Sequence, residues 1–360
     1  MNTTITCGFF LLCWGMMFPY GIAQSKDETV ELRISFLDSL GRSLAYHDLD
    51  SAFTVTQTAL ALSLQHDLPS NRAHLLSQLG LLYKKEGDYA QSHVFQDSSR
   101  RLYRQLGDSV GMALPIRREA DLFRIEGQYP EAQAYFLHAL RLLENSQDSL
   151  GISGAWVNLG ILYTVQQQFD IAQQYYQKAL GYIYRNPDTL QLINLYTNIG
   201  TTNYYQGNLD SASFYFNKAL EFKSNGQFVH KMLPIYGNLA GLKLQMEKFD
   251  EAKIEFERGL KLIKRLNLDS SLVGLRYMSN YALVLAQIGE KGKAIAILNS
   301  TKTAAELKNL NEILANSLFN LTKLYELEGR PQKALNLLQE YVTVREKVLN
   351  EETIEQVSKF

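Results

Sequence analysis

The sequence predicts an all-α protein, an α-α superhelix of about eight helix-turn-helix repeats. The composition, 46% hydrophobic and 20% charged over 360 residues, is that of a folded chain and argues against disorder. Apolar residues recur three, four and seven positions apart, which marks one face of an amphipathic helix. A small residue also recurs with a fixed period, at positions 52, 92, 132, 172, 212, 252, 294 and 334.

The start of the chain differs from the rest. No charged side chain precedes Lys26, and residues 9–17 form a short apolar core. Gly21 and Ala23 are small residues at the two positions that signal peptidase reads. We therefore expect residues 1–23 to be a signal peptide, cleaved after Ala23, that exports the protein to the periplasm or out of the cell. The alternative is an uncleaved N-terminal membrane anchor. Cleavage would remove both cysteines, Cys7 and Cys13, as suits an exported protein without disulfides.

The unit that repeats is a pair of helices. Its best-preserved copy has Trp156, Leu159 and Gly160 in the first helix, and Ala172 and Ala179 in the second. The same frame returns every forty residues, with one step of forty-two. In five copies a glycine stands between the two helices, where the first helix must end and the chain turn: Gly87, Gly127, Gly207, Gly289 and Gly329.

Glycine also occurs inside the first helix, as at Gly160 and Gly200. A glycine there costs about 1 kcal/mol relative to alanine, so it needs a packing reason. We expect the second helix to cross closely at these points, with Ala172 and Ala212 buried at the crossings. The repeats are assigned to residues 33–72, 73–112, 113–152, 153–192, 193–232, 233–274, 275–314 and 315–350 of a solenoid spanning 24–350, followed by a C-terminal helical extension, 351–360.

This pattern resembles the tetratricopeptide repeat (TPR) family over residues 33–350, because the glycine and alanine spacing recurs in phase. One departure is the length, since the usual repeat has about 34 residues and this one has forty. Lengthened repeats of this kind resemble those of kinesin light chains and of bacterial peptide-sensing regulators. HEAT and armadillo repeats share the longer period but lack this spacing. The resemblance implies a solenoid whose concave face binds a peptide or protein segment.

The sequence offers no chemistry for an enzyme. Its six histidines show no metal-ligand spacing, so we expect neither a metal nor a cofactor. Residues 289–294 are similar to a phosphate loop, but Ala294 stands where a magnesium-binding Ser or Thr is needed. The net charge of -1 gives the chain no overall attraction to nucleic acid. A non-enzymatic binding protein is therefore the first hypothesis.

Asparagines recur at one position of the first helices. Five successive copies carry Asn158, Asn198, Asn238, Asn280 and Asn320. Asparagine is a mediocre residue inside a helix, so helix propensity does not explain the series. Each amide could bond a neighbouring helix and stiffen the stack. In related peptide-binding repeats, however, asparagines at this place hydrogen-bond the backbone of an extended ligand. That resemblance predicts a groove flanked by Thr164, Asn194, Thr197, Thr201, Tyr204 and Tyr205.

Basic residues gather in the third repeat, at Arg117, Arg118 and Arg124, with Lys84 and Lys85 one repeat earlier. One interpretation is that these are ordinary solvated helix charges, because Glu119 lies among them. The other interpretation is an electropositive stretch of the groove that attracts a carboxylate or an acidic peptide.

The last residues suggest a second hypothesis. Residues 329–360 resemble the segment that leads into a transmembrane helix in exported bacterial TPR sensors, which continue into a histidine kinase or a regulator output domain. On this interpretation the chain is a stand-alone or truncated sensory ectodomain, and its partner is a membrane-bound signalling protein.

Overall fold

The computed structural model describes residues 26–357 except 46–47, 145, 147, 186 and 223–228. Within this part there are sixteen α-helices and no strand, which confirms the all-α prediction. None of the described helices combines the length and the apolar character that a membrane span requires. The predicted signal peptide, with its cleavage site at Ala23, lies outside the described residues.

The helices form eight consecutive pairs, as the repeat predicts. The first helices are α1 (Lys26–Leu44), α3 (Pro69–Glu86), α5 (Ser109–Ile125), α7 (Ser149–Val165), α9 (Thr189–Tyr205), α11 (Val229–Gln245), α13 (Leu272–Gln287) and α15 (Asn311–Leu327). The second helices are α2 (Leu49–Gln65), α4 (Tyr89–Gln105), α6 (Tyr129–Leu143), α8 (Phe169–Arg185), α10 (Leu209–Leu220), α12 (Phe249–Arg265), α14 (Lys291–Leu307) and α16 (Pro331–Val357). Most have 15 to 17 residues, whereas α16 has 27.

The turn between the two helices of a pair repeats with the sequence period. All five glycines predicted there have a positive φ, for example 99° at Gly87 and 78° at Gly127. Two copies hold the same left-handed turn without glycine, with φ of 59° at both Gln167 and Glu247. A residue with a Cβ is strained in this region. The backbone of the turn is therefore preserved in seven copies, from 87 to 329, although the glycine is not.

Close packing explains the glycines inside the first helices. Ala172 and Ala212 are fully buried, as expected for the crossings. The space beside Gly160 and Gly200 is filled by an aromatic ring of the second helix. A Cβ added to Gly200 would lie 2.7 Å from Cδ1 of Phe216, and the ring of Tyr176 takes the same place over Gly160. An added methyl group would have to displace a ring from the core.

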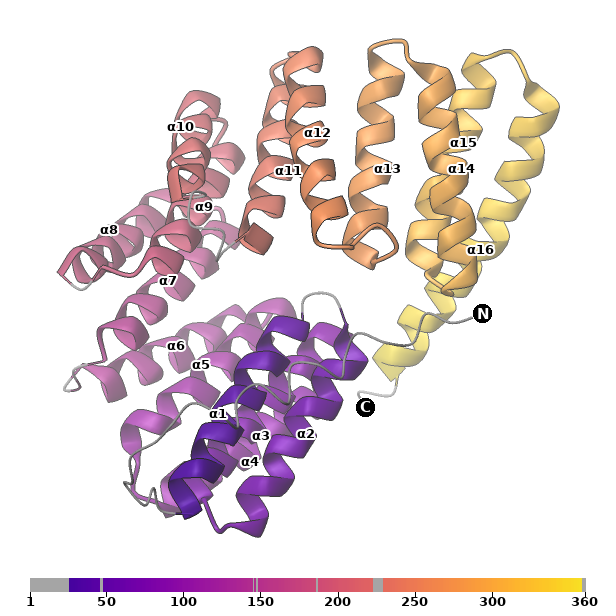
Figure 1. Ribbon diagram of the computed structural model, residues 1–360. Coiled ribbons are helices and arrows are strands. Elements are labelled where there is room, and N and C mark those ends of the chain that lie inside the picture. Colours follow the sequence, from indigo (N-terminus) through magenta and orange to yellow (C-terminus); the bar gives the residue numbers. More distant parts are fainter. Residues whose placement is uncertain are drawn as a thin grey trace, which may run out of the picture.

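The pairs follow one another along a curved array (Figure 1). Most first helices of neighbouring pairs contact each other, as in α3–α5, α5–α7 and α7–α9, whereas α11 and α13 make no comparable contact in the described chain. Second helices of neighbouring pairs make no comparable contact in the part of the chain described here. The first helices therefore form the inner layer of the superhelix and the second helices its outer layer.

Candidate binding groove

The inner layer encloses an open cavity of about 1080 Å³, referred to below as the inner cavity. Its walls come mainly from α5, α7 and α9, with Arg42 of α1, His74 of α3, and Lys231 and Pro234 of α11 at its edges. The floor is largely apolar, and includes Leu114, Val157, Ile161, Leu190 and Ile193. A concave site with an apolar floor and a few polar groups is the usual form of a ligand site.

Two of the five predicted asparagines, Asn158 and Asn198, line the inner cavity. Asn194 and Thr197, one helical turn away from Asn198, line it as well. The side chains of Asn158 and Asn198 are half-buried, and neither amide has a hydrogen bond to any described residue. Each therefore presents a donor and an acceptor to whatever occupies the cavity.

The other three asparagines of the series lie outside the inner cavity. Asn280 is exposed, and Asn238 and Asn320 are half-buried. No hydrogen bond of their side chains is present among the described residues, so none of the three amides ties neighbouring helices together. The five asparagines occupy the same position of the repeat, but only Asn158 and Asn198 lie where the surface forms the inner cavity.

Of the flanking positions expected in the groove, some line the inner cavity and others do not. Thr201, Tyr204 and Tyr205 do not line the inner cavity. The Thr201 hydroxyl donates to the carbonyl of Thr197 at 2.9 Å, and the Tyr205 side chain is exposed. Thr164 corrects the expectation, because it is buried in the core. Its hydroxyl bonds those of Thr202 at 2.8 Å and Tyr176 at 3.1 Å.

Two of the three predicted arginines, Arg117 and Arg118, line the inner cavity. Arg118 donates from Nη1 to Oγ of Ser77 at 2.8 Å and from Nη2 to Oε1 of Gln78 at 2.9 Å. Both acceptors are buried and neutral, so they fix the guanidinium without cancelling its charge.

Arg124 does not line the cavity. Its Nε and Nη2 donate to Oδ1 of Asp121 at 2.9 and 2.7 Å, and Nζ of Lys84 reaches Oδ2 of the same carboxylate at 2.5 Å. Arg124 is thus committed to an ion pair three residues away on its own helix. Of the three predicted arginines, only Arg117 and Arg118 therefore line the cavity.

Burial disfavours the charged form of both cavity arginines. It lowers the pKa of Arg117, and burial together with the charge of Arg117 lowers the pKa of Arg118 to about 9. Both side chains stay protonated at neutral pH. An anion placed between them would relieve the repulsion and the desolvation cost.

Residues that the asparagine series does not reveal also line the inner cavity. Gly154 and Ile161 flank Asn158, one helical turn before and about one turn after it. Positions three or four apart share one face of a helix, so this spacing could have indicated both residues. The sequence could not indicate Leu143 and Asp148, because they come from the end of α6 and the connection that follows it.

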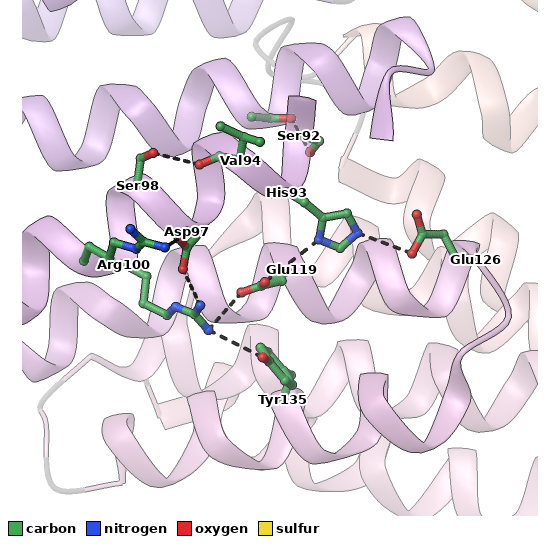
Figure 2. A network of polar contacts seen from close by, with 11 residues as sticks. Ser92, His93, Val94, Asp97, Ser98, Arg100, Glu119, Glu126 and Tyr135 are labelled. Carbon is green, nitrogen blue, oxygen red and sulfur yellow. Dashed lines mark hydrogen bonds and ion pairs between the residues drawn. The ribbon is translucent and has the colours of Figure 1, made fainter. Parts of the chain in front are cut away.

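On the other side of α5, a polar network joins this helix to α4 and α6 (Figure 2). His93 lies between two carboxylates, with Nε2 at 3.3 Å from Glu126 and Nδ1 at 3.9 Å from Glu119. Arg100 pairs with Glu119 at 3.2 Å and with Asp97 at 2.5 Å. The hydrogen bond to Glu119 raises the pKa of His93 against the opposing effect of burial. Glu119 directly follows the two arginines, so the network holds the helix that presents them.

Comparisons with known proteins agree with this architecture. Residues 151–225 and 233–265 match family models described as tetratricopeptide repeat. No curated protein sequence matches the chain significantly.

Several solved structures share the fold. The apo form of the quorum sensor NprR from B. thuringiensis has a TM-score of 0.62 and 13% identity, with 89% of both chains covered. A signal transduction ATPase with a tetratricopeptide repeat sensor, PH0952 from Pyrococcus horikoshii, has a TM-score of 0.65 and 14% identity over 89% of this chain and 48% of that one. A Rap protein complexed with competence and sporulation factor has a TM-score of 0.57 and 14% identity, over 90% of this chain and 99% of that one.

At such identities the matches establish the fold alone. Together with the two family-model matches and the forty-residue period, they identify the repeat unit. The chain is a tetratricopeptide repeat protein with lengthened repeats.

Proposed function

We propose that this protein is a non-enzymatic scaffold that binds an extended peptide or protein segment in the inner cavity. The observation that carries the proposal is the pair of unbonded amides, Asn158 and Asn198, over an apolar floor. An amide can bond a peptide group whatever side chain that group carries, and the floor can take apolar side chains. The Rap protein named above, crystallised with competence and sporulation factor, supports the proposal by fold analogy.

The same proposal includes an acidic character for the bound segment, because two arginines line the inner cavity. The carboxylates that line it are engaged elsewhere. Asp121 pairs with Lys84 and Arg124, and Asp148 accepts the amide of Gly151 at 2.8 Å at the start of α7.

Export remains part of the proposal on the sequence alone. Removal of residues 1–23 would place the scaffold in the periplasm or outside the cell, and the alternative is an N-terminal anchor. The expected product is a mature chain that begins at Gln24, which intact mass after expression in a fractionated bacterial host would detect. A mass that retains Met1 would contradict cleavage.

A sensory ectodomain acting through a membrane-bound signalling partner is the second candidate. The fold match to NprR, a quorum sensor, favours it.

Hydrogen exchange can test where a segment binds. The mature chain would be screened against a panel of extended peptides, and amide exchange measured with and without the best binder. We expect added protection in α7 and α9, whose asparagines face the inner cavity. The internal control is α13 and α15, which carry Asn280 and Asn320 outside the cavity. Protection centred on α13 and α15, or no peptide bound at all, would contradict the proposal.

A further inference from the structure

The two arginines of the inner cavity differ in what holds them. Arg118 is fixed by Ser77 and Gln78. Among the described residues, Arg117 has no hydrogen bond and no ion pair, although it lies largely within the protein. Asp148 and Asp121 act on Arg117 only from beyond ion-pair distance, and both are engaged with other groups. No direct ion pair with a described residue therefore compensates the charge of Arg117.

The position of Arg117 depends on a glycine of the next repeat. A Cβ built on Gly154 would collide with Nη1 of Arg117, so the guanidinium lies directly against the backbone of α7. Asn158 follows Gly154 by four residues and lines the same cavity. The guanidinium of Arg117 thus contacts α7 about one helical turn before the unbonded amide of Asn158.

An uncompensated arginine in such a place costs folding stability. A side chain that only supported the fold would be expected to find a carboxylate, as Arg124 and Arg100 do in the same region. Groups whose charge is disfavoured by burial and which line a cavity are characteristic of functional sites.

We propose that Arg117, seated on Gly154, binds a carboxylate of the segment held in the groove. The inference rests on the proposed function and names the chemistry of its ligand. The carboxylate can belong to an Asp or Glu side chain or to a free C-terminus, and a guanidinium can bind either with two parallel hydrogen bonds. Arg118 adds fixed positive charge beside it. Val157 and Ile161 of the floor then receive an apolar side chain next to that carboxylate.

Three variants separate a binding role from a structural one. Arg117→Met removes the charge and keeps the length of the side chain. Gly154→Ala leaves the charge in place and displaces the guanidinium, which can move because it ends a flexible side chain. Gly181→Ala on α8 is the matched control, since a Cβ there meets nothing within 4 Å.

The probes are versions of one peptide that binds the mature chain. The versions carry Glu or Gln inside the sequence, and each ends in either a free acid or an amide. We expect the unmodified chain to prefer one acidic version over its neutral counterpart by about 10-fold or more, as a charge-assisted bond would give. The version preferred identifies the source of the carboxylate. Arg117→Met and Gly154→Ala should lose that preference and still bind the neutral peptide, whereas Gly181→Ala should keep it.

Denaturation without ligand supplies a second measurement. Arg117→Met should have an unchanged or higher midpoint, because the arginine makes no contact that the fold needs. A lower midpoint would make Arg117 a structural residue and overturn the inference. Equal binding of acidic and neutral peptides by the unmodified chain would also overturn it while leaving the proposed function intact. Failure to bind any peptide would overturn both.

Discussion

The repeats around α7 and α9 differ from those around α13 and α15, although their sequences share one register. Asn158 and Asn198 are half-buried in a cavity, whereas Asn280 stands exposed at the equivalent position. Apolar side chains follow the same trend. Ile161 is half-buried, but Leu283 of α13 and Phe319 of α15 are exposed. The same position of the repeat thus has different surroundings in the two regions, and only around α7 and α9 does it line the inner cavity.

The sharpest test of this comparison replaces equivalent asparagines by alanine in each of the two regions. Asn158→Ala with Asn198→Ala should weaken peptide binding by about 1–3 kcal/mol, which is roughly 5- to 150-fold, because two hydrogen bonds of about 0.5–1.5 kcal/mol each are lost. Asn280→Ala with Asn320→Ala is the matched control and should bind normally. Titration by fluorescence anisotropy measures both. Equal losses in the two double variants would show that the groove continues along the whole array.

Core packing should also depend on position in the array. Ala172→Leu should lower the free energy of unfolding by roughly 1–3 kcal/mol, because its site is fully buried between helices on both sides. Ala334→Leu in α16 should cost less, since the last pair has a neighbour on one side in the described chain. Urea denaturation of the two variants measures the difference. A larger loss at residue 334 would reverse the comparison.

In contrast to binding and core packing, backbone strain at the turns should not depend on the position of the repeat in the array. Gln167→Gly and Glu247→Gly should each raise the free energy of unfolding by about 0.5–1 kcal/mol, because glycine adopts a positive φ without the steric cost that a Cβ imposes. The control is Gly127→Ala, which introduces that cost at an equivalent turn and should destabilise the protein. A loss of stability in both glycine variants would show that the Gln167 and Glu247 side chains contribute more than the strain.

The network of Figure 2 should make stability depend on pH in the first half of the array. The pKa of His93 is raised in the folded chain, so its charged form is the one that folding stabilises. The contribution of His93 to the free energy of unfolding is fully present below its unfolded pKa of about 6.5. This contribution is lost as the pH rises through the higher pKa of His93 in the folded chain. His93→Gln should remove this part of the pH dependence, as denaturation midpoints between pH 5 and 8.5 would show. A pH profile that the variant leaves unchanged would contradict this role.

The sequence was sufficient to predict the helix pairs, their period and the burial of Ala172, because these depend on local periodicity and on residues that only one geometry accepts. It predicted a turn in every pair, but it indicated the turn residue only where glycine marks it. It did not indicate the left-handed conformation of Gln167 and Glu247, where the surrounding fold imposes a conformation that the residue disfavours. Of the predicted site, Asn158, Asn198, Arg117 and Arg118 lie together.

Other site residues could not be assigned from the sequence alone. Arg124 was misassigned because its ion pair with Asp121 and Lys84 joins two repeats, and a linear pattern does not reveal it. Thr164 shares a helix face with groove positions, but α9 covers it with Thr202.

The stacking of the pairs has a mechanical consequence. Substantial contacts join each helix to the next helix along the chain and, in the inner layer except between α11 and α13, to the one after that. A pull on the two ends would therefore be shared among many small interfaces. Because the walls of the inner cavity come mainly from three neighbouring first helices, α5, α7 and α9, such a pull would change its width. The proposed binding site would then respond to force applied at the distant ends of the array.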